Sequence, residues 1–194
     1  MPDRVELHKS VLRYFYPVDT PLRRLLVAHS MMVRDKALAL AEKSGMDLNT
    51  DIVVNGAMMH DIGIIKCNAP DIFCEGTRPY LMHGTLGAEM LRDYGRVHLT
   101  DMELYARICE RHTGAGITAE EIKRNQLPLP EMDLMPETPE EKLICFADKF
   151  FSKSGSMQEK TVPHIRRSIE RFGAEPLRRF DELCRLFMPD GGSF

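Results

Sequence analysis

The feature that most constrains the fold of this chain is the pair His60-Asp61 inside the apolar segment Met59-His60-Asp61-Ile62-Gly63. Burying a charged aspartate is costly unless another charge or a metal ion compensates it. A metal ion does so well, because it accepts imidazole nitrogen and carboxylate oxygen together. A fold that buries this segment must therefore bring further ligands to it from elsewhere in the chain.

Helix signals dominate the rest of the sequence. Thr20-Pro21 and Thr138-Pro139 each read as an N-cap followed by a proline in the first turn, ahead of an apolar stretch. Helical spacing of apolar residues predicts helices over residues 21–44, 50–60, 84–94, 104–112, 162–172 and 175–187, and another after Thr138. No run of alternating β-branched residues is long enough for a strand. The sequence predicts an all-α, multi-helix bundle.

Local signals set several expected helix ends. Three pairs are spaced as capping boxes, namely Thr100 with Glu103, Thr118 with Glu121, and Thr138 with Glu141. Gly63 is expected to end the second helix with a positive φ, and Gly95 to end the helix over 84–94. Residues 66–82 look like an ordered loop, and the proline-rich residues 126–139 look like a connector.

The length and net charge of the chain limit the number of domains and the classes of partner that we expect. A chain of 194 residues suggests one domain, which we divide into an N-terminal helical extension (1–19), a central domain (20–155) and C-terminal helices packed on it (156–194). A net charge of −3 argues against nucleic acid as the main partner. No apolar run approaches the roughly 20 residues of a membrane span, and no leader or membrane contact is expected. Apolar residues near the C-terminus fit either the core or a homodimer contact.

The chain has five cysteines, which is an odd number and too few for its length to form a disulfide-stabilised scaffold. We interpret them as buried apolar residues, and a reducing cytoplasm is the expected compartment.

Two further residues are candidate ligands for the same ion as His60-Asp61. His29 shares a helical stripe with apolar residues, and Asp148 lies in the apolar stretch Ile144–Phe151. Alone, His29 fits a hydrogen-bonded core histidine, and Asp148 fits a capping acid or an i,i+4 partner. Together with His60 and Asp61, they give each of three buried helices at least one residue of a type that commonly binds metal ions. This joint pattern favours a metal site.

His83 and His112 extend this pattern. His83 precedes the glycine-rich start of a helix, and His112 ends another helix in His112-Thr113-Gly114. Each alone fits a surface or capping histidine. Together they would complete a second metal site.

The order His29, His60-Asp61, Asp148 resembles the signature of the HD-domain superfamily of metal-dependent phosphohydrolases, and Met59–Gly63 is similar to its HDIG variant. The resemblance covers roughly residues 20–155. It implies an HD-domain bundle with the metal site between core helices. The chain departs from HD-GYP relatives, because Ile64-Ile65 precede Lys66 where those proteins place lysine directly after glycine, and no GYP tripeptide is present.

The resemblance implies a site with one or two divalent transition-metal ions. His29, His60, Asp61 and Asp148 would hold one ion, and Asp61, His83 and His112 the other, with Asp61 bridging. Mixed imidazole and carboxylate ligands suit iron, manganese, nickel or zinc better than calcium. Two such ions would activate a hydroxide and clamp a phosphoryl group.

Phosphate oxygens need cationic or N–H donors. Lys66 is the first choice for a catalytic and substrate-binding cation, and Arg111 and Thr113 are further substrate-binding candidates. A solvated surface charge is the alternative for Lys66 and Arg111.

The expected activity is hydrolysis of a phosphate ester or anhydride of a nucleotide-like small molecule. The enzyme class stays open between phosphoric monoester, diester and dinucleoside polyphosphate hydrolases. A sensor module that binds metal and ligand without turnover, and an HD-fold di-iron oxygenase, are the alternatives.

Overall fold

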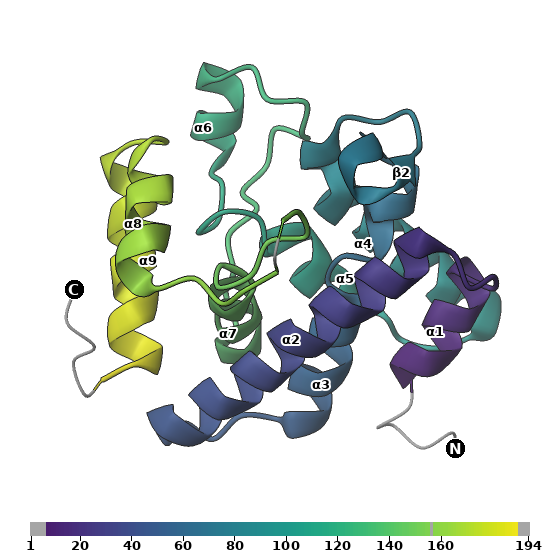
Figure 1. Cartoon of the computed structure of the whole chain (residues 1–194), viewed down its shortest axis with the longest axis horizontal. Coiled ribbons are helices and arrows are strands. Elements are labelled where there is room, and N and C mark those ends of the chain that lie inside the picture. The colour runs from purple at the N-terminus through teal and green to yellow at the C-terminus, as the bar shows by residue number, and fades with distance from the viewer. Residues whose placement is uncertain (1–6, 156, 190–194) are drawn as a thin grey trace.

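The protein is described here by a computed structural model of residues 7–155 and 157–189 (Figure 1). Helices account for most of this part of the chain, which confirms the all-α class. The α-helices are α1 (Leu7–Phe15), α2 (Pro21–Ser44), α3 (Thr50–Met59), α4 (His83–His98), α5 (Glu103–Arg111), α6 (Ala119–Arg124), α7 (Pro139–Asp148), α8 (Val162–Glu170) and α9 (Ala174–Phe187).

The expected loop over residues 66–82 is ordered by short elements. It follows the 3-10 helix η2 (Ile62–Lys66) and contains η3 (Pro70–Ile72) and η4 (Tyr80–Met82). A two-stranded antiparallel sheet of β1 (Asn68–Ala69) and β2 (Cys74–Glu75), which the sequence did not predict, closes the loop.

The long helix α2 organises the bundle and packs against both α3 and α7. Its start follows the predicted signals, because the Thr20 side chain accepts a hydrogen bond from the backbone N–H of Arg23, and Pro21 follows. It ends at Gly45, whose φ of 66° is left-handed. Figure 1 shows α1 and the pair α8–α9 at opposite ends of the molecule.

The buried apolar residues form two clusters. One joins the second half of α2 to α7, α8 and α9 and includes Phe146 and Phe180. The other joins α1, the first half of α2, η2 and α4 and includes Leu91. Along α2, Leu26 belongs to the second cluster and Val33 to the first, so the helix passes from one to the other near residue 29.

The C-terminal apolar residues divide between core and surface. Phe180, Leu183 and Phe187 are buried in the core, whereas Phe172 is 76% exposed and Leu186 is 38% exposed. A homodimer contact therefore stays a prediction. No helix among the described residues has the length and apolar character needed to cross a membrane.

Two of the three predicted capping boxes are present. In those at Thr118 and Thr138, the threonine side chain and the glutamate three residues later each accept the other residue's backbone N–H. The box at Thr100 is wrong. Instead, the Asp101 carboxylate accepts the backbone N–H of Glu103 at 3.0 Å.

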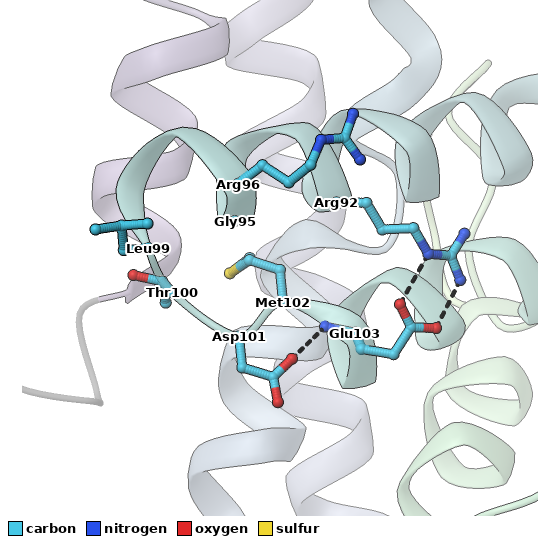
Figure 2. Close-up of a pocket in the computed structure, with 8 residues that line it drawn as sticks. All are labelled: Arg92, Gly95, Arg96, Leu99, Thr100, Asp101, Met102 and Glu103. Carbon is cyan, nitrogen blue, oxygen red and sulfur yellow. Dashed lines mark hydrogen bonds and ion pairs between the residues drawn. The ribbon is translucent and has the colours of Figure 1, made fainter.

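Figure 2 shows that the Glu103 carboxylate binds the guanidinium of Arg92 in α4 rather than the preceding backbone. Helix α4 also runs past Gly95, where we expected it to end, to His98, and it is Leu99 that adopts the left-handed conformation after the last turn. A pocket of about 430 Å³ at this junction contains none of the candidate ligands.

The five cysteines are free and buried, as predicted. The division of the chain at residues 19/20 and 155/156 stays a prediction. Its outer segments include residues 1–6, 156 and 190–194, which lie outside the described part.

Candidate metal centre

All six predicted metal ligands meet in one buried cluster between the two apolar cores. They come from five places in the fold, namely mid-α2 (His29), the end of α3 (His60 and Asp61), the first residue of α4 (His83), the end of α5 (His112) and the last residue of α7 (Asp148). Their exposed fractions are at most 9%.

Asp61 lies at the centre of the cluster, and its two oxygens face different groups. Oδ2 is 2.9 Å from His60 Nε2 and 3.2 Å from His29 Nε2. Oδ1 is 3.3 Å from His83 Nε2 and 3.4 Å from His112 Nε2. The carboxylate thus stands between two histidine pairs.

Asp148 completes the group on the Oδ2 side of Asp61. Its Oδ1 is 3.0 Å from His29 Nε2 and 3.4 Å from His60 Nε2. Ligand atoms held about 2.1 Å from one metal ion lie about 3.0 to 3.4 Å apart at octahedral or tetrahedral angles. The spacings in both groups match this range.

Three of the histidines are held in one tautomer by their own backbone. Nδ1 of His60, His83 and His112 donates to the carbonyl three residues earlier, at 2.6, 2.7 and 2.6 Å. A neutral ring that donates from Nδ1 presents a lone pair at Nε2. The two Nε2 atoms of His83 and His112 are 3.0 Å apart, so their lone pairs converge on one point.

Converging lone pairs and carboxylate oxygens repel one another unless a cation lies between them. In the described part of the chain, His60 Nε2 and both carboxylate oxygens of Asp61 are buried without a hydrogen bond of good geometry. Buried polar atoms are normally paired, and exceptions mark ion or cofactor sites. The donor set of nitrogen and oxygen atoms therefore fits metal ions of the transition series.

The protonation states also suit metal binding, which requires neutral imidazoles and ionised carboxylates. Burial lowers the pKa of His83 to about 3 and lowers that of His112. Burial opposes ionisation of Asp61, but His60 and Lys153 hold its pKa well below the usual range. His60 is the exception, because burial disfavours its charge but Asp61 beside it outweighs the effect of burial and raises the pKa of His60 to about 9, so a metal ion there would replace the proton on its ring.

A close crossing of η2 and α4 brings His83 to Asp61. A Cβ at Gly63 would overlap the His83 carbonyl oxygen and the backbone of Gly87. The predicted positive φ at Gly63 is wrong, since it is not among the positive-φ glycines. What the position requires is a small residue, because the backbone of α4 lies directly against it.

Two lysines that the sequence analysis did not assign lie at the cluster. Lys153 Nζ is 2.6 Å from Asp61 Oδ2, and its side chain is 11% exposed. Lys149 Nζ is 2.9 Å from Asp148 Oδ2 and donates to the His112 carbonyl at 3.2 Å. Helix α7 ends at Asp148, and the ammonium group of Lys149, the next residue, lies on the same side as the Asp148 carboxylate. The available signal was two lysines within five residues of Asp148.

The three predicted substrate-binding residues lie differently. Lys66 is exposed at the end of η2, and no ion pair links it to the cluster among the described residues. Arg111 is engaged elsewhere, because its guanidinium binds Glu137 at 2.8 Å and the Met135 carbonyl at 3.3 Å. Thr113 is half-buried in the turn that follows His112.

Comparison with known proteins places these residues in a family. The model of the HD domain matches residues 26–152, which contain all six cluster residues. The chain is 38% and 34% identical, over 128 and 127 residues (66% of the chain in each case), to proteins named tRNA (cytidine(56)-2'-O)-methyltransferase in Picrophilus torridus and Thermoplasma volcanium. It is 39% identical over 126 residues, 63% of the chain, to an uncharacterized protein of Methanocaldococcus jannaschii. The match spans about a third of each methyltransferase and 64% of the third protein.

Among solved structures, the HD domain of the L. monocytogenes phosphodiesterase PgpH aligns with 91% of this chain and 94% of its own. The TM-score is 0.50 and the sequence identity 19%, so this similarity concerns the fold. The same domain in complex with Cyclic-di-AMP aligns with 96% of this chain and 98% of its own, with the same TM-score and identity. The fold, the family match and the gathered ligand set agree, and the chain belongs to the HD domain family.

Proposed function

We propose that this protein is a metal-dependent phosphohydrolase with a dinuclear centre bridged by Asp61. The observation that carries the proposal is the orientation of the Asp61 carboxylate, whose two oxygens face separate groups of ligand atoms. His29, His60 and Asp148 would hold one ion with Asp61 Oδ2, and His83 and His112 would hold the other with Asp61 Oδ1.

The divalent ions would act as Lewis acids toward a phosphoryl oxygen. They would also lower the pKa of bound water, so that hydroxide is available as a nucleophile near neutral pH. The residues around them supply rigidity and charge. Three Nδ1–carbonyl bonds fix the imidazole planes, which keeps the Nε2 atoms aimed at the centre. Cys109 and Met59 are fully buried, and the Cys109 thiol donates to the His60 carbonyl, so water is excluded at that point.

Lys153 takes the role that the sequence suggested for Lys66. Its ammonium group lies 2.6 Å from Asp61 Oδ2, where it would donate to a phosphoryl oxygen and stabilise the charge that develops there. Arg111 has carboxylate partners elsewhere, so we leave it out of the site. Thr113, next to His112, remains a candidate for a hydroxyl contact to phosphate.

We propose a nucleotide-like phosphate ester or anhydride as substrate. The PgpH domain of the same fold has been solved with Cyclic-di-AMP, which supports screening cyclic and linear nucleotides first. Two relatives are named as tRNA methyltransferases, although the match spans only about a third of each. RNA fragments with terminal phosphates therefore belong in the same screen.

The test is a release assay on the full chain loaded with manganese, iron, nickel or cobalt. We expect the wild type to release inorganic phosphate or a nucleoside phosphate from at least one substrate. The Asp61→Ala variant should release neither. Metal-loaded protein that binds nucleotides without product release would support the sensor alternative. Oxygen consumption with a polyol and iron, without phosphate release, would support the oxygenase alternative.

A further inference from the structure

A second, smaller pocket adjoins the metal cluster. It has a volume of about 150 Å³ and is lined by Asp148, Lys149, Phe151, Lys160, Ile165 and Ile169. Asp148 belongs to both places, because its Oδ1 faces His29 while its Oδ2 faces Lys149. The pocket and the metal cluster therefore share one carboxylate, and a substrate that reaches past Asp148 would place a second group in the pocket.

The pocket carries positive charge that the protein does not balance locally. Lys149 already binds Asp148, but Lys160 Nζ donates only to the Phe151 carbonyl, at 3.3 Å, among the described interactions. No carboxylate of the described residues forms an ion pair with Lys160, whereas neighbouring Glu159 pairs with Lys36 at 2.6 Å. Half-buried cations without a counter-ion are unfavourable, so this pocket favours an anion.

The electrostatic surroundings of Lys160 agree with that inference. Partial burial lowers the pKa of Lys160, Asp148 raises it, and the charges of Lys149 and Lys153 lower it further. A bound anionic group would relieve both the desolvation and the repulsion among the three lysines.

We propose that this pocket is a subsite for a second phosphate group of the substrate. The proposal rests on the phosphohydrolase function proposed above and narrows it to substrates with two anionic groups, such as nucleoside diphosphates or dinucleotides. Lys160 and Lys149 bind the second phosphate, and Ile165 and Ile169 contact the adjoining carbon atoms. Ser168 contributes no free donor, because its hydroxyl donates to the His164 carbonyl at 3.1 Å.

The subsite also lies at the edge of the family match. The HD domain model ends at residue 152, whereas Lys160 and the two isoleucines of α8 follow it. The metal ligands thus come from the family region, and the subsite comes largely from this chain's own C-terminal part.

The experiment compares two probes, inorganic phosphate and the non-hydrolysable methylenediphosphonate, by calorimetric titration of the manganese-loaded full chain. The wild type should bind the diphosphonate about tenfold more tightly than phosphate, the ratio expected from one added charged contact. Lys160→Met should lower the affinity for the diphosphonate about tenfold and so abolish that preference. Lys160→Arg should retain it, and Lys43→Met, an exposed lysine at the end of α2, should change neither affinity.

The outcomes separate the two proposals. Metal-dependent phosphate binding with an unchanged diphosphonate preference in Lys160→Met would overturn the subsite and leave the phosphohydrolase intact. Absence of metal-dependent phosphate binding by the wild type would overturn both. Thermal unfolding of each variant verifies that the fold is retained.

Discussion

Individual histidines in this protein are oriented by the chain that immediately precedes them. His60, His83 and His112 each donate a hydrogen bond from Nδ1–H to the carbonyl three residues earlier. The backbone at the end or start of each helix therefore orients the histidine that it carries. This arrangement needs no additional carboxylate to fix the tautomer. His29 differs, because it lies mid-helix, where the preceding carbonyls already accept helical N–H groups, and its Nδ1 has no partner among the described residues.

The ligand residues could be predicted because each is a polar group in an apolar segment, which is a local property. The lysines could not, because their positions depend on the path of the chain after α7. Likewise, Arg111 directly precedes His112 in the sequence, but its partner Glu137 lies near the end of the 126–139 connector, and their meeting depends on the path of that connector.

At this scale, Lys153→Met tests whether the ammonium group acts on substrate. We expect kcat to fall about 100-fold with a full complement of metal, because a donor to the reacting phosphoryl group is lost. Lys153→Arg should restore part of the rate. Steady-state kinetics with metal analysis measures both. An unchanged kcat, or a loss of rate explained entirely by lost metal, would contradict this role.

Among the elements, the crossing of η2 and α4 is the contact on which the second ligand group depends. Gly63→Ala should destabilise the metal-free protein by about 3 kcal/mol, since the added methyl group overlaps the backbone of α4. Gly45→Ala is the control, with no atom within 4 Å of the new methyl group and only the cost of its left-handed φ, about 1 kcal/mol. Urea unfolding measures both. An equal loss of unfolding free energy in the two variants would contradict this, because it would mean that α4 can move away from Gly63 without a loss of stability.

The capping boxes allow a matched comparison between elements. Thr138→Ala should cost about 1 kcal/mol, because the Thr138 hydroxyl accepts the Glu141 backbone N–H at 3.2 Å. Thr100→Ala should be nearly neutral, since its hydroxyl caps no helix and donates to the His98 carbonyl. Thermal unfolding of the two variants checks this, and a larger effect at Thr100 would contradict the observed start of α5.

The same comparison shows how far local sequence predicts helix ends. At Thr118 and Thr138 the glutamate of the box also binds an arginine of another element, yet its carboxylate still accepts the N-cap backbone N–H, and the predicted cap forms. At Thr100 the glutamate is taken by Arg92 of the preceding helix, an interaction between elements that the four-residue pattern does not contain.

Across the whole molecule, the C-terminal helix is tied to the turn that follows His112. Arg179 of α9 donates to the carbonyls of Ala115 and Gly116 at 3.2 and 3.1 Å and binds the carboxylate of Glu121 at 2.8 Å. Arg179 and Glu121 are each 9% exposed. This bridge connects α6 and α9 to the loop that carries a ligand.

The bridge should make stability depend on pH in a defined direction. Burial opposes the charge on Glu121, but hydrogen bonds from Thr118 and Arg179 lower its pKa below the ordinary glutamate value of 4.5. Its contribution is therefore present above pH 4.5 and is lost as pH falls through the lower folded value. The difference in Tm between wild type and Glu121→Gln should be large at pH 7 and shrink in acid. Glu182→Gln, in an exposed pair with Arg178, is the control. A pH-independent difference would contradict the assignment.

The two apolar cores meet at the polar cluster, so the metal centre joins the two parts of the fold. The central claim is that Asp61 bridges two ions in this centre, and metal content per chain tests it most directly. Elemental analysis after reconstitution with manganese and gel filtration should find two ions in the wild type and in His164→Ala, which alters an exposed histidine. It should find one ion in His83→Ala and none in Asp61→Ala. Two ions retained by a folded Asp61→Ala variant would contradict the account.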